Sequence, residues 1–257
     1  PSPFVVLKEE AKQEVKELVE RYYITSDPAH EQKIRTQVHE SHRARPTPIR
    51  DFDQFLATDQ TVTKRACYLL DQGELVHTKV LFLGDDDHTS LAVASVAIES
   101  NVTVLDIDER ILNSISDMSK SHQYGIETIC HDLRKPLPKD LLDSFDVVFT
   151  DPPYTPSGIT LFINQGLSAL KKQSTSRLYF CYGTSDRARE RELAIQSIIT
   201  EHGLLIHEKL FHFNAYTGAE SIGGSSSLVV CKLTPQTQFS FKEVSGIYTN
   251  SHGPEHA

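Results

Sequence analysis

Long apolar segments are absent from the sequence. None of its 257 residues lies in an apolar run of about 18 or more, the length that a membrane-spanning helix needs. The first ten residues, PSPFVVLKEE, show no basic region followed by a long apolar core, so we expect no secretory signal peptide. The sequence therefore predicts a protein without a membrane span or a secretory signal.

Cysteine is scarce, and its spacing suits neither a metal nor a disulfide framework. The four cysteines, at positions 67, 130, 181 and 231, form no CxxC or CxxH pair, which excludes the usual zinc and dithiol patterns. Three of them lie in apolar segments (ETIC, LYFCYG and LVVCKL), as buried packing cysteines do. We expect reduced cysteines, no metal site and a cytoplasmic protein.

Basic residues are also fewer than acidic residues. Lys and Arg number 26 against 35 Asp and Glu, a formal net charge of −9. Proteins that bind nucleic acids normally carry a basic face, so we expect no nucleic-acid partner. An acidic protein instead tolerates or attracts a small cationic substrate.

The chain length suits one large domain, or a smaller domain with an appendage. Apolar residues recur at helical spacing over 4–24, which predicts one amphipathic helix. Its apolar face leaves open whether the protein forms a homodimer. We predict a short helical appendage over 1–48, a Rossmann-like main domain over 49–257, and a loosely ordered tail over 235–257.

The main domain alternates apolar strands with helical segments. The predicted strands are residues 79–84, 101–106, 126–130, 145–150, 177–182, 204–213 and 227–233. The helices predicted between them are residues 89–100, 109–124, 159–172 and 186–202. This alternation predicts an α/β fold with a seven-stranded, mostly parallel, doubly wound sheet and an antiparallel final strand. A ligand of such a sheet binds beyond the carboxyl ends of the central strands.

Acidic residues stand at the ends of the first four strands. Two candidates for a carboxylate that binds ribose hydroxyls, Asp106 and Asp108, follow Gly84 by 22 and 24 residues. Asp132, after the third strand, is placed to accept a hydrogen bond from an adenine amino group. Any one of these acids alone is more often a helix cap or a turn residue. Together they predict a nucleoside site.

The turn after the first strand argues against a phosphate ligand. Dinucleotide-binding loops use several small residues so that pyrophosphate can approach the backbone, whereas here Gly84 is followed by Asp85, Asp86 and Asp87. NAD, FAD and ATP are therefore disfavoured. The carboxylate of intact S-adenosylmethionine would be repelled, whereas its decarboxylated form is a dication that these aspartates would attract. One or two of them could simply cap the following helix.

The tetrapeptide at Asp151, Pro152, Pro153 and Tyr154 is a second signal. DPPY after an apolar strand is typical of adenosylmethionine-fold enzymes that alkylate nitrogen. Two prolines stiffen the turn and direct the acid, the carbonyls and the ring toward the reacting nitrogen. A tyrosine face also suits a cation. The structural alternative is a Pro-Pro turn with an aspartate cap.

Four segments together carry a resemblance to a known family. They are GDDDHTSLA (84–92), VLDIDER (104–110), HDLRKPLP (131–138) and TDPPYT (150–155). In order and spacing they resemble the branched-chain polyamine synthases, which are N4-bis(aminopropyl)spermidine synthases. The stretch from Asp53-Gln54 to LLDQGEL (69–75) and the segment around FNAY (213–216) extend the resemblance to about residues 50–230.

The resemblance implies a Rossmann-like, adenosylmethionine-dependent transferase fold. It also implies an aminopropyltransferase that takes decarboxylated S-adenosylmethionine as co-substrate. This enzyme would transfer the aminopropyl group to an amine nitrogen of a polyamine such as spermidine and release methylthioadenosine. Because such amines are protonated at neutral pH (~10.4 for a lysine-like amine), the attacking nitrogen must first lose a proton.

The resemblance also implies roles for individual residues. Asp86 is expected to accept the proton, and Asp151 to hold the amine near the donor. The residues expected to bind the nucleoside donor are Gly84, Asp85, Asp106 or Asp108, and Asp132. Those expected to surround the amine are Asp87, Pro152, Pro153, Tyr154, Asn214, Tyr216 and Glu220.

Two other functions remain open at this point. An S-adenosylmethionine-dependent N-methyltransferase shares the DPPY segment, although it would normally have a first loop of small residues. A non-catalytic polyamine-binding protein would not need the acids expected to bind adenosine. The sequence leaves open which amine is the acceptor and how many transfers occur.

Overall fold

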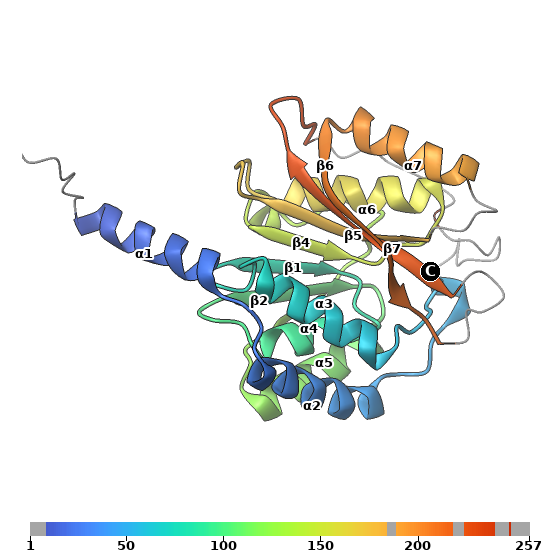
Figure 1. The fold of residues 1–257 in the computed structure, drawn as a ribbon. Helices are drawn as coiled ribbons and strands as arrows, with labels where there is room; N and C mark the ends of the chain where they lie inside the picture. The colour runs from blue at the N-terminus through green and yellow to red at the C-terminus, as the bar shows by residue number, and fades with distance from the viewer. Residues whose placement is uncertain (1–8, 184–188, 218–223, 240–246, 248–257) are drawn as a thin grey trace, which may run out of the picture.

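A seven-stranded sheet forms the centre of the computed structural model, which describes residues 9–183, 189–217, 224–239 and 247 (Figure 1). The strands are β1 (Lys79–Leu83), β2 (Asn101–Asp106), β3 (Glu127–Cys130), β4 (Val147–Thr150), β5 (Arg177–Gly183), β6 (Leu204–Ala215) and β7 (Ser225–Leu233). Their order is β3-β2-β1-β4-β5-β7-β6. Neighbours from β3 to β5 are parallel, and β7 is antiparallel to both β5 and β6. The predicted doubly wound sheet with an antiparallel final strand is confirmed.

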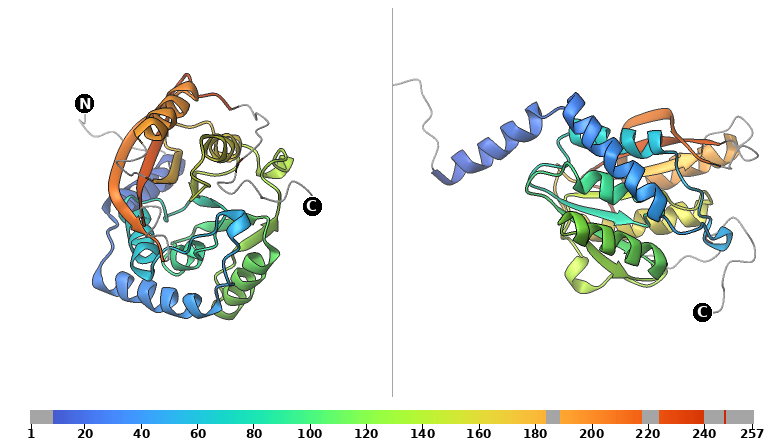
Figure 2. Two further views of the ribbon diagram at one scale, coloured as in Figure 1. Left: turned by 90° about the vertical axis from the view of Figure 1, so that its right-hand side faces the viewer. Right: turned by 90° about the horizontal axis from the view of Figure 1, so that it is seen from below.

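Helices cover both faces of this sheet. They are α1 (Glu9–Tyr23), α2 (Pro28–Ala44), α3 (Asp59–Asp71), α4 (Thr89–Ala94), α5 (Glu109–His122), α6 (Pro156–Ala169) and α7 (Arg189–Glu201), with 3-10 turns η1 (Arg50–Phe52) and η2 (Lys139–Leu141). Side chains of α2, α3, α4 and α5 pack on one face and those of α6 and α7 on the other. The molecule is thus a three-layer α/β structure (Figure 2).

The central strand β1 is apolar from Val80 to Leu83 because both of its faces are buried. Val80 and Phe82 face the cluster of α2 to α5, whereas Leu81 and Leu83 face α6 and α7. All four are fully buried. A strand covered on both faces needs apolar residues at every position.

Parallel pairing brings the carboxyl ends of the central strands to one edge. Leu83 of β1 pairs with Leu105 of β2 and with Thr150 of β4. The segment 84–87, Asp106 and Asp151 therefore follow at one level. The strand order reverses on either side of β1, which is where a doubly wound sheet opens a crevice for its ligand.

Helix α2 belongs to the core, although we expected residues 1–48 to be an appendage. Ile34 and Val38 lie on one helical face, are 0% and 1% exposed, and pack with α3 and α4. Asp27 caps the helix by accepting a hydrogen bond from the His30 amide at 2.8 Å. The boundary at residue 48 therefore does not separate α2 from the main domain, because a narrow apolar face was hidden among polar residues.

Helix α1 extends away from the body of the molecule (Figure 1). Its last turn is anchored there, since Arg21 donates to the Gly73 carbonyl at 3.2 Å and pairs with Glu74 at 3.3 Å. On its remaining length Val15, Leu18 and Val19 are largely exposed. The predicted amphipathic helix over 4–24 is present from Glu9, and residues 1–8 lie outside the described part.

Helices α4 and α6 differ most from the sequence pattern. Helix α4 ends at Ala94 instead of residue 100, because the chain then turns and Ile98 exchanges backbone hydrogen bonds with the segment before β1. Helix α6 begins at Pro156 instead of residue 159. Its start is set by Thr155, whose hydroxyl accepts the Gly158 amide at 2.9 Å.

Parts of the predicted tail over 235–257 are packed. The Gln238 amide donates to the His202 carbonyl at 3.0 Å, and Ile247 is buried. The Ile247 carbonyl accepts a hydrogen bond from the Thr155 hydroxyl at 2.8 Å. Residues 240–246 and 248–257 lie outside the described residues. Across the described part of the chain, no helix is both long and apolar enough to span a bilayer.

Truncation of the buried face of α2 tests whether it belongs to the cooperative core. We expect Ile34→Ala to lower the free energy of unfolding by about 2–5 kcal/mol, because a fully buried branched side chain is lost. The matched control is Val15→Ala on the exposed side of α1, where the change should stay within about 0.5 kcal/mol. Urea unfolding measures both, and equal, small effects would show that α2 does not share the core.

Candidate active site

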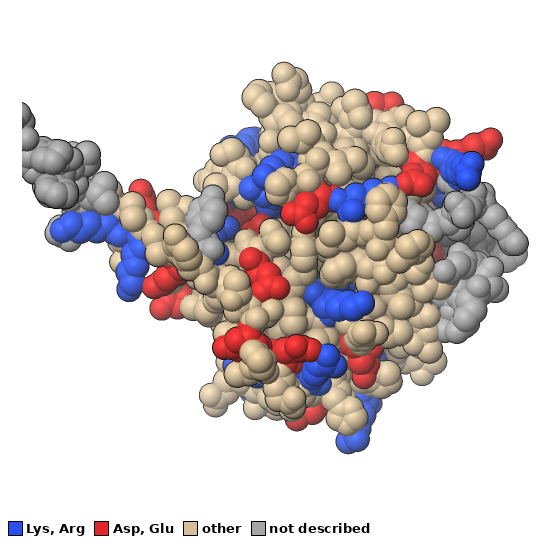
Figure 3. All heavy atoms as spheres, viewed as in Figure 1, with Lys and Arg blue, Asp and Glu red and all other residues tan. Residues whose placement is uncertain are grey.

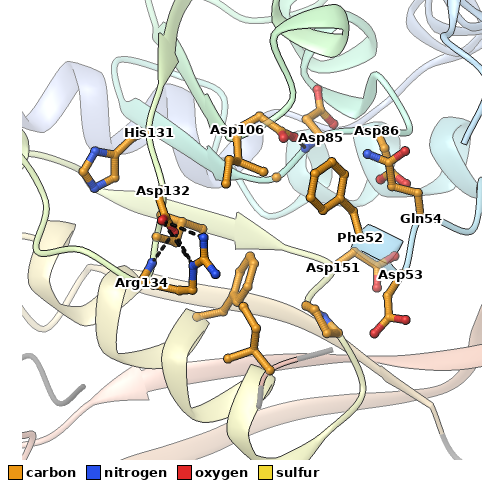
Figure 4. Close-up of a pocket in the computed structure, with 16 residues that line it drawn as sticks. Phe52, Asp53, Gln54, Asp85, Asp86, Asp106, His131, Asp132, Arg134 and Asp151 are labelled. Carbon is orange, nitrogen blue, oxygen red and sulfur yellow. Dashed lines mark hydrogen bonds and ion pairs between the residues drawn. The ribbon is translucent and has the colours of Figure 1, made fainter. Parts of the chain in front are cut away.

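A pocket opens beyond the carboxyl ends of β1, β2 and β4, at the edge predicted for a ligand (Figure 4). The space between its walls is about 680 Å³, a volume that includes open solvent. Six aspartates reach its walls: Asp53, Asp85, Asp86, Asp106, Asp132 and Asp151. Apolar side chains complete them: Phe52, Ile107, Leu133, Pro153, Phe162 and Ile247.

The pocket has two chemically different ends. Figure 4 shows Asp53, Asp86 and Asp151 at one end and His131, Asp132 and Arg134 at the other, with Asp85 and Asp106 between them. On the outer face seen in Figure 3, by contrast, acidic and basic side chains are intermixed. Acids are therefore gathered at one end of the pocket, unlike on that outer face.

Gly84 and Asp85 shape the turn after β1. Gly84 has a left-handed φ of 72°, which glycine adopts without strain. The carboxylate of Asp85 accepts hydrogen bonds from the Thr89 and Ser90 amides at 2.8 and 3.0 Å, so it holds the start of α4. Burial raises the pKa of Asp85 to about 7 despite these bonds. Asp85 thus acts as a cap and also borders the pocket.

Asp86 faces the pocket, as Asp85 of the same turn does. Its side chain is half-buried, and among the described residues its carboxylate has no hydrogen-bond or ion-pair partner. Burial raises its pKa well above the ordinary value, and the charges of Asp87, Asp151, Asp106 and Asp85 raise it further. An unpaired carboxyl with a raised pKa is suited to accept a proton.

Asp87 points the other way, into the protein. Its carboxylate accepts hydrogen bonds from Arg65 at 2.8 Å and from the Ala57 amide at 2.5 Å. It is 2% exposed and does not line the pocket. The structure therefore places the predicted amine ligand Asp87 behind the site.

Asp151 lines the pocket and is held from behind by three side chains. Its Oδ2 accepts from Arg65 at 2.5 Å and from the Tyr216 hydroxyl at 2.7 Å, and its Oδ1 accepts from the Tyr154 hydroxyl at 2.9 Å. Burial raises the pKa of both tyrosines, followed by the charge of Asp151, so both remain protonated donors. The predicted group of Asp151, Tyr154 and Tyr216 is thus brought together.

The remaining predicted amine ligands lie deeper or outside the described residues. Asn214 is fully buried; its Oδ1 accepts from Arg65 at 2.9 Å and its Nδ2 donates to Ser226 at 2.8 Å. Pro153 lines the pocket, whereas the buried Pro152 does not. Glu220 lies outside the described residues. Asn214 therefore supports the group around Asp151 and has no place on the pocket wall.

The structure distinguishes the two candidates for ribose binding. Asp106 lines the pocket, where its oxygens accept the Asp85 and Asp108 amides at 3.1 and 2.9 Å, and burial raises its pKa to about 6. Asp108 instead caps α5, pairs with Arg110 at 2.6 Å and accepts from Gln54 at 3.2 Å. Only Asp106 is placed to meet a ligand.

The far end of the pocket pairs an acidic residue, Asp132, with a basic residue, Arg134. Arg134 holds Asp132 with hydrogen bonds of 2.9 Å to each carboxylate oxygen. Burial would raise the pKa of Asp132, but the hydrogen bonds and charge of Arg134 outweigh it and leave that pKa below its usual value. This end is therefore polar and nearly balanced in charge. Within the described chain, no group of His, Cys, Asp or Glu is arranged to hold a metal ion.

Residues 33–252 match the model of a known protein family, the branched-chain polyamine synthase A C-terminal domain. The chain belongs to this family. The resemblance inferred from the motifs is thereby confirmed.

Individual relatives agree with this assignment. The N(4)-bis(aminopropyl)spermidine synthase of Methanocaldococcus jannaschii is 34% identical over 174 residues, which cover 67% of this chain and 49% of the relative. An uncharacterized protein of the same organism is 41% identical over 184 residues, 72% of this chain and 46% of that protein. The chain spans about half the length of the curated relatives it matches.

A solved structure confirms the fold. The branched-chain polyamine synthase from Thermus thermophilus, crystallised in complex with N4-aminopropylspermidine and 5'-methylthioadenosine, aligns with a TM-score of 0.75 and 28% sequence identity. The alignment covers 83% of this chain and 67% of that one. The Rossmann-like transferase fold that the sequence predicted is therefore present.

Some pocket residues of this branched-chain polyamine synthase family member were missed by sequence reasoning. Phe52, Asp53 and Gln54 reach the pocket from η1 and the segment after it, far from any strand end. Their one signal was that Asp53-Gln54 belongs to the resembling stretch. Arg65 was missed because it lies in the middle of a helix with no motif around it. Its role follows only from the packing of α3 against the sheet.

The raised pKa of Asp85 predicts a specific pH dependence of stability. Between about pH 4 and 7 the folded protein retains a proton at this carboxyl that the unfolded chain has lost. The contribution of Asp85 to the free energy of unfolding must therefore fall as pH rises through this window, by an amount on the order of 4 kcal/mol.

Asp85→Asn removes this contribution. The stability of the variant relative to the wild type should increase with pH between about 4 and 7, measured by urea unfolding at several pH values. Asp132→Asn is the matched control, because a lowered pKa gives stability that is present above about pH 4 and lost below it. A flat difference for Asp85→Asn would contradict the raised pKa.

Proposed function

We propose that this protein is an aminopropyltransferase of branched polyamine synthesis. It moves an aminopropyl group from decarboxylated S-adenosylmethionine to an amine nitrogen of a polyamine such as spermidine and releases methylthioadenosine. The observation that carries the proposal is the two-ended pocket, in which the unpaired Asp86 stands between further acids and a polar end suited to a nucleoside. The chemistry in the names of its relatives supports it.

The reaction is a direct displacement. A protonated amine of the acceptor first gives its proton to the Asp86 carboxylate. The lone pair of the nitrogen then attacks the carbon next to the sulfonium; the new N–C bond forms as the C–S bond breaks. The C–S electron pair returns to sulfur, and methylthioadenosine leaves as a neutral molecule. Because sulfonium is already a good leaving group, the protein's main task is to hold two cations at reacting distance.

The acidic end of the pocket suits the acceptor amine. Asp86 has a raised pKa and therefore accepts a proton more readily than an ordinary aspartate. Asp53 and Asp151 border the same end, so that other ammonium groups of a polyamine meet carboxylates there. Tyr154 and Tyr216 keep Asp151 in place from behind.

The other part of the pocket suits adenosine. Each carboxylate oxygen of Asp106 accepts one backbone amide and retains a lone pair for a ribose hydroxyl. Asp132 can accept a hydrogen bond from the adenine amino group. Ile107 and Leu133 provide apolar surface beside them. The donor sulfonium then lies toward Asp86.

The charge of the pocket also favours the decarboxylated donor. An intact S-adenosylmethionine would bring its carboxylate toward Asp85 and Asp86, which are buried or half-buried where screening by water is weak. The decarboxylated donor instead brings an ammonium to these acids. These acids would therefore repel the carboxylate of the intact donor and attract the ammonium of the decarboxylated donor.

Calorimetric titration of the purified protein with the two donors tests the proposal. We expect clear preference for decarboxylated S-adenosylmethionine, and the appearance of methylthioadenosine once spermidine is added. Preference for the intact donor would assign the protein to the N-methyltransferases. Binding of spermidine without either donor would leave a non-catalytic polyamine-binding protein.

Asp86→Asn tests the proton acceptor. An amide cannot accept the proton of the ammonium, so we expect transfer to be abolished while donor affinity stays within about tenfold, which is about 1.4 kcal/mol. Asp117→Asn, an equal loss of charge at an exposed position of α5, is the matched control. Release of methylthioadenosine at fixed substrate concentrations reports both. Unimpaired turnover of Asp86→Asn would remove Asp86 from this role.

Separate substitutions of Asp106 and Asp108 test the ribose site. Asp106→Ala should weaken binding of methylthioadenosine by about tenfold or more, because hydrogen bonds to a charged group are lost. Asp108→Ala should leave this affinity within about threefold and lower stability by about 1 kcal/mol through the lost helix cap. Calorimetry and urea unfolding measure the two effects, and the reverse pattern would exchange the two residues.

A further inference from the structure

A buried cation lies behind the acidic pocket. Arg65, in the middle of α3, is 1% exposed, and its guanidinium carbon lies 5.4 Å from the centre of the Phe149 ring. An exposed arginine among the acids at this end of the pocket would weaken their attraction for a polycation. Because Arg65 is shielded behind the carboxylates, it can act on them without meeting the substrate.

The guanidinium of Arg65 connects three parts of the sheet that are distant in sequence. Its Nη1 donates to Asp87 after β1 at 2.8 Å, its Nη2 to Asp151 after β4 at 2.5 Å, and its Nε to Asn214 of β6 at 2.9 Å. Its Nη2 also lies 3.3 Å from the Tyr216 hydroxyl. One rigid, planar group therefore fixes the spacing of two acids that β1 and β4 only bring near each other.

Arg65 also leaves one acid different from the others. Backbone amides hold Asp85 and Asp106, and Arg65 offsets the charges of Asp87 and Asp151. Of these five acids, Asp86 is the one whose carboxylate has no partner among the described residues. The turn thus offers the substrate one carboxylate, that of Asp86, whose charge is not offset by a partner.

We propose that Arg65 is the positioning residue of the transfer reaction, which sets the place of Asp151 and the protonation of Asp86 through its bonds to Asp87 and Asp151. This inference rests on the proposed aminopropyl transfer. It adds that Arg65, which does not touch the substrate, determines which acid accepts the proton. Without Arg65, Asp87 and Asp151 would lose their nearest cation, and the acids would titrate together at higher pH.

The other ionisable groups around Asp86 are the same in every variant considered. Asp85 lies in the same turn, Asp106 ends β2, and Asp53 follows η1. Arg45, which does not line the pocket, lies 4.0 Å from Asp87. Burial raises the pKa of Tyr154, Tyr216 and Cys181, so that they remain neutral near neutral pH. A difference between wild type and an Arg65 variant therefore reports the arginine.

The test compares Arg65→Met with Arg65→Lys. The pH dependence of kcat/KM for methylthioadenosine release is recorded with one donor and one acceptor, so that the titration of the substrates is common to all. For Arg65→Met we expect the acidic limb to move up by about one pH unit or more and kcat to fall about 100-fold. Arg65→Lys retains the charge without the planar geometry. The acidic limb of its kcat/KM profile should therefore stay near the wild-type position, while kcat remains low.

Two further variants separate this role from support of the fold. Arg65→Met with Asp87→Asn removes one cation and one anion together; it should fold better than Arg65→Met alone and move the limb part of the way back. Arg21→Met is the matched control, because it breaks an ion pair with the buried Glu74 at a position outside the pocket lining. It should lower stability and leave the limb unchanged. An acidic limb of Arg65→Met that coincides with the wild-type limb would overturn the inference.

Infrared titration of the buried carboxyls gives a readout that does not need activity. Bands of protonated carboxyls are followed against pH in wild type and Arg65→Met, and Asp86→Asn assigns the band of Asp86. We expect this band to persist to higher pH in Arg65→Met. If wild type transfers no aminopropyl group but the band still moves, the proposed function fails and the electrostatic role of Arg65 stands. If wild type is active and the band does not move, the inference about Arg65 is wrong.

Discussion

Repulsion among carboxylates at one edge of the sheet is the constraint on which this end of the molecule depends. Parallel pairing of β1, β2 and β4 places their carboxyl ends at one level, and an acid follows each of them. Charges this close and this buried are stable only when each has a compensating partner. Backbone amides supply it for Asp85 and Asp106, and Arg65 for Asp87 and Asp151. Asp86 has no such partner among the described residues, and burial together with the neighbouring acids raises its pKa instead.

This compensation ties the N-terminal helices to the site. Arg65 reaches the strand ends from α3, and α3 packs on α2 through the same apolar cluster that covers the sheet. The segment between α2 and α3 adds Phe52 and Asp53 to the pocket wall. Segments that look peripheral in the sequence are therefore part of the site, since they supply both its cation and one of its walls.

The proposed transfer from a sulfonium nucleoside to an amine would require two kinds of recognition, and the pocket has two chemically different ends. One end is acidic and can hold ammonium groups, whereas the other, around Asp132 and Arg134, is polar and nearly balanced in charge. Apolar side chains, among them Phe52, Leu133 and Phe162, complete the walls. Membership in the branched-chain polyamine synthase family is consistent with this division, and half of the length of the curated relatives lies beyond the matched region.

The sequence by itself determined the sheet, its helices and the edge where the acids meet, because apolar strand runs and the residues that follow them are local signals. It also pointed to Asp86, Asp106 and Asp151 through motifs next to strand ends. Only the tertiary structure decided which acids face the pocket: it turned Asp87 inward, used Asp108 as a helix cap and placed Asn214 behind Asp151. It also joined α2 to the core and brought Arg65 to the strand ends. These outcomes depend on contacts between residues up to about 150 positions apart in the chain, and no local pattern records which side of a turn such partners will occupy.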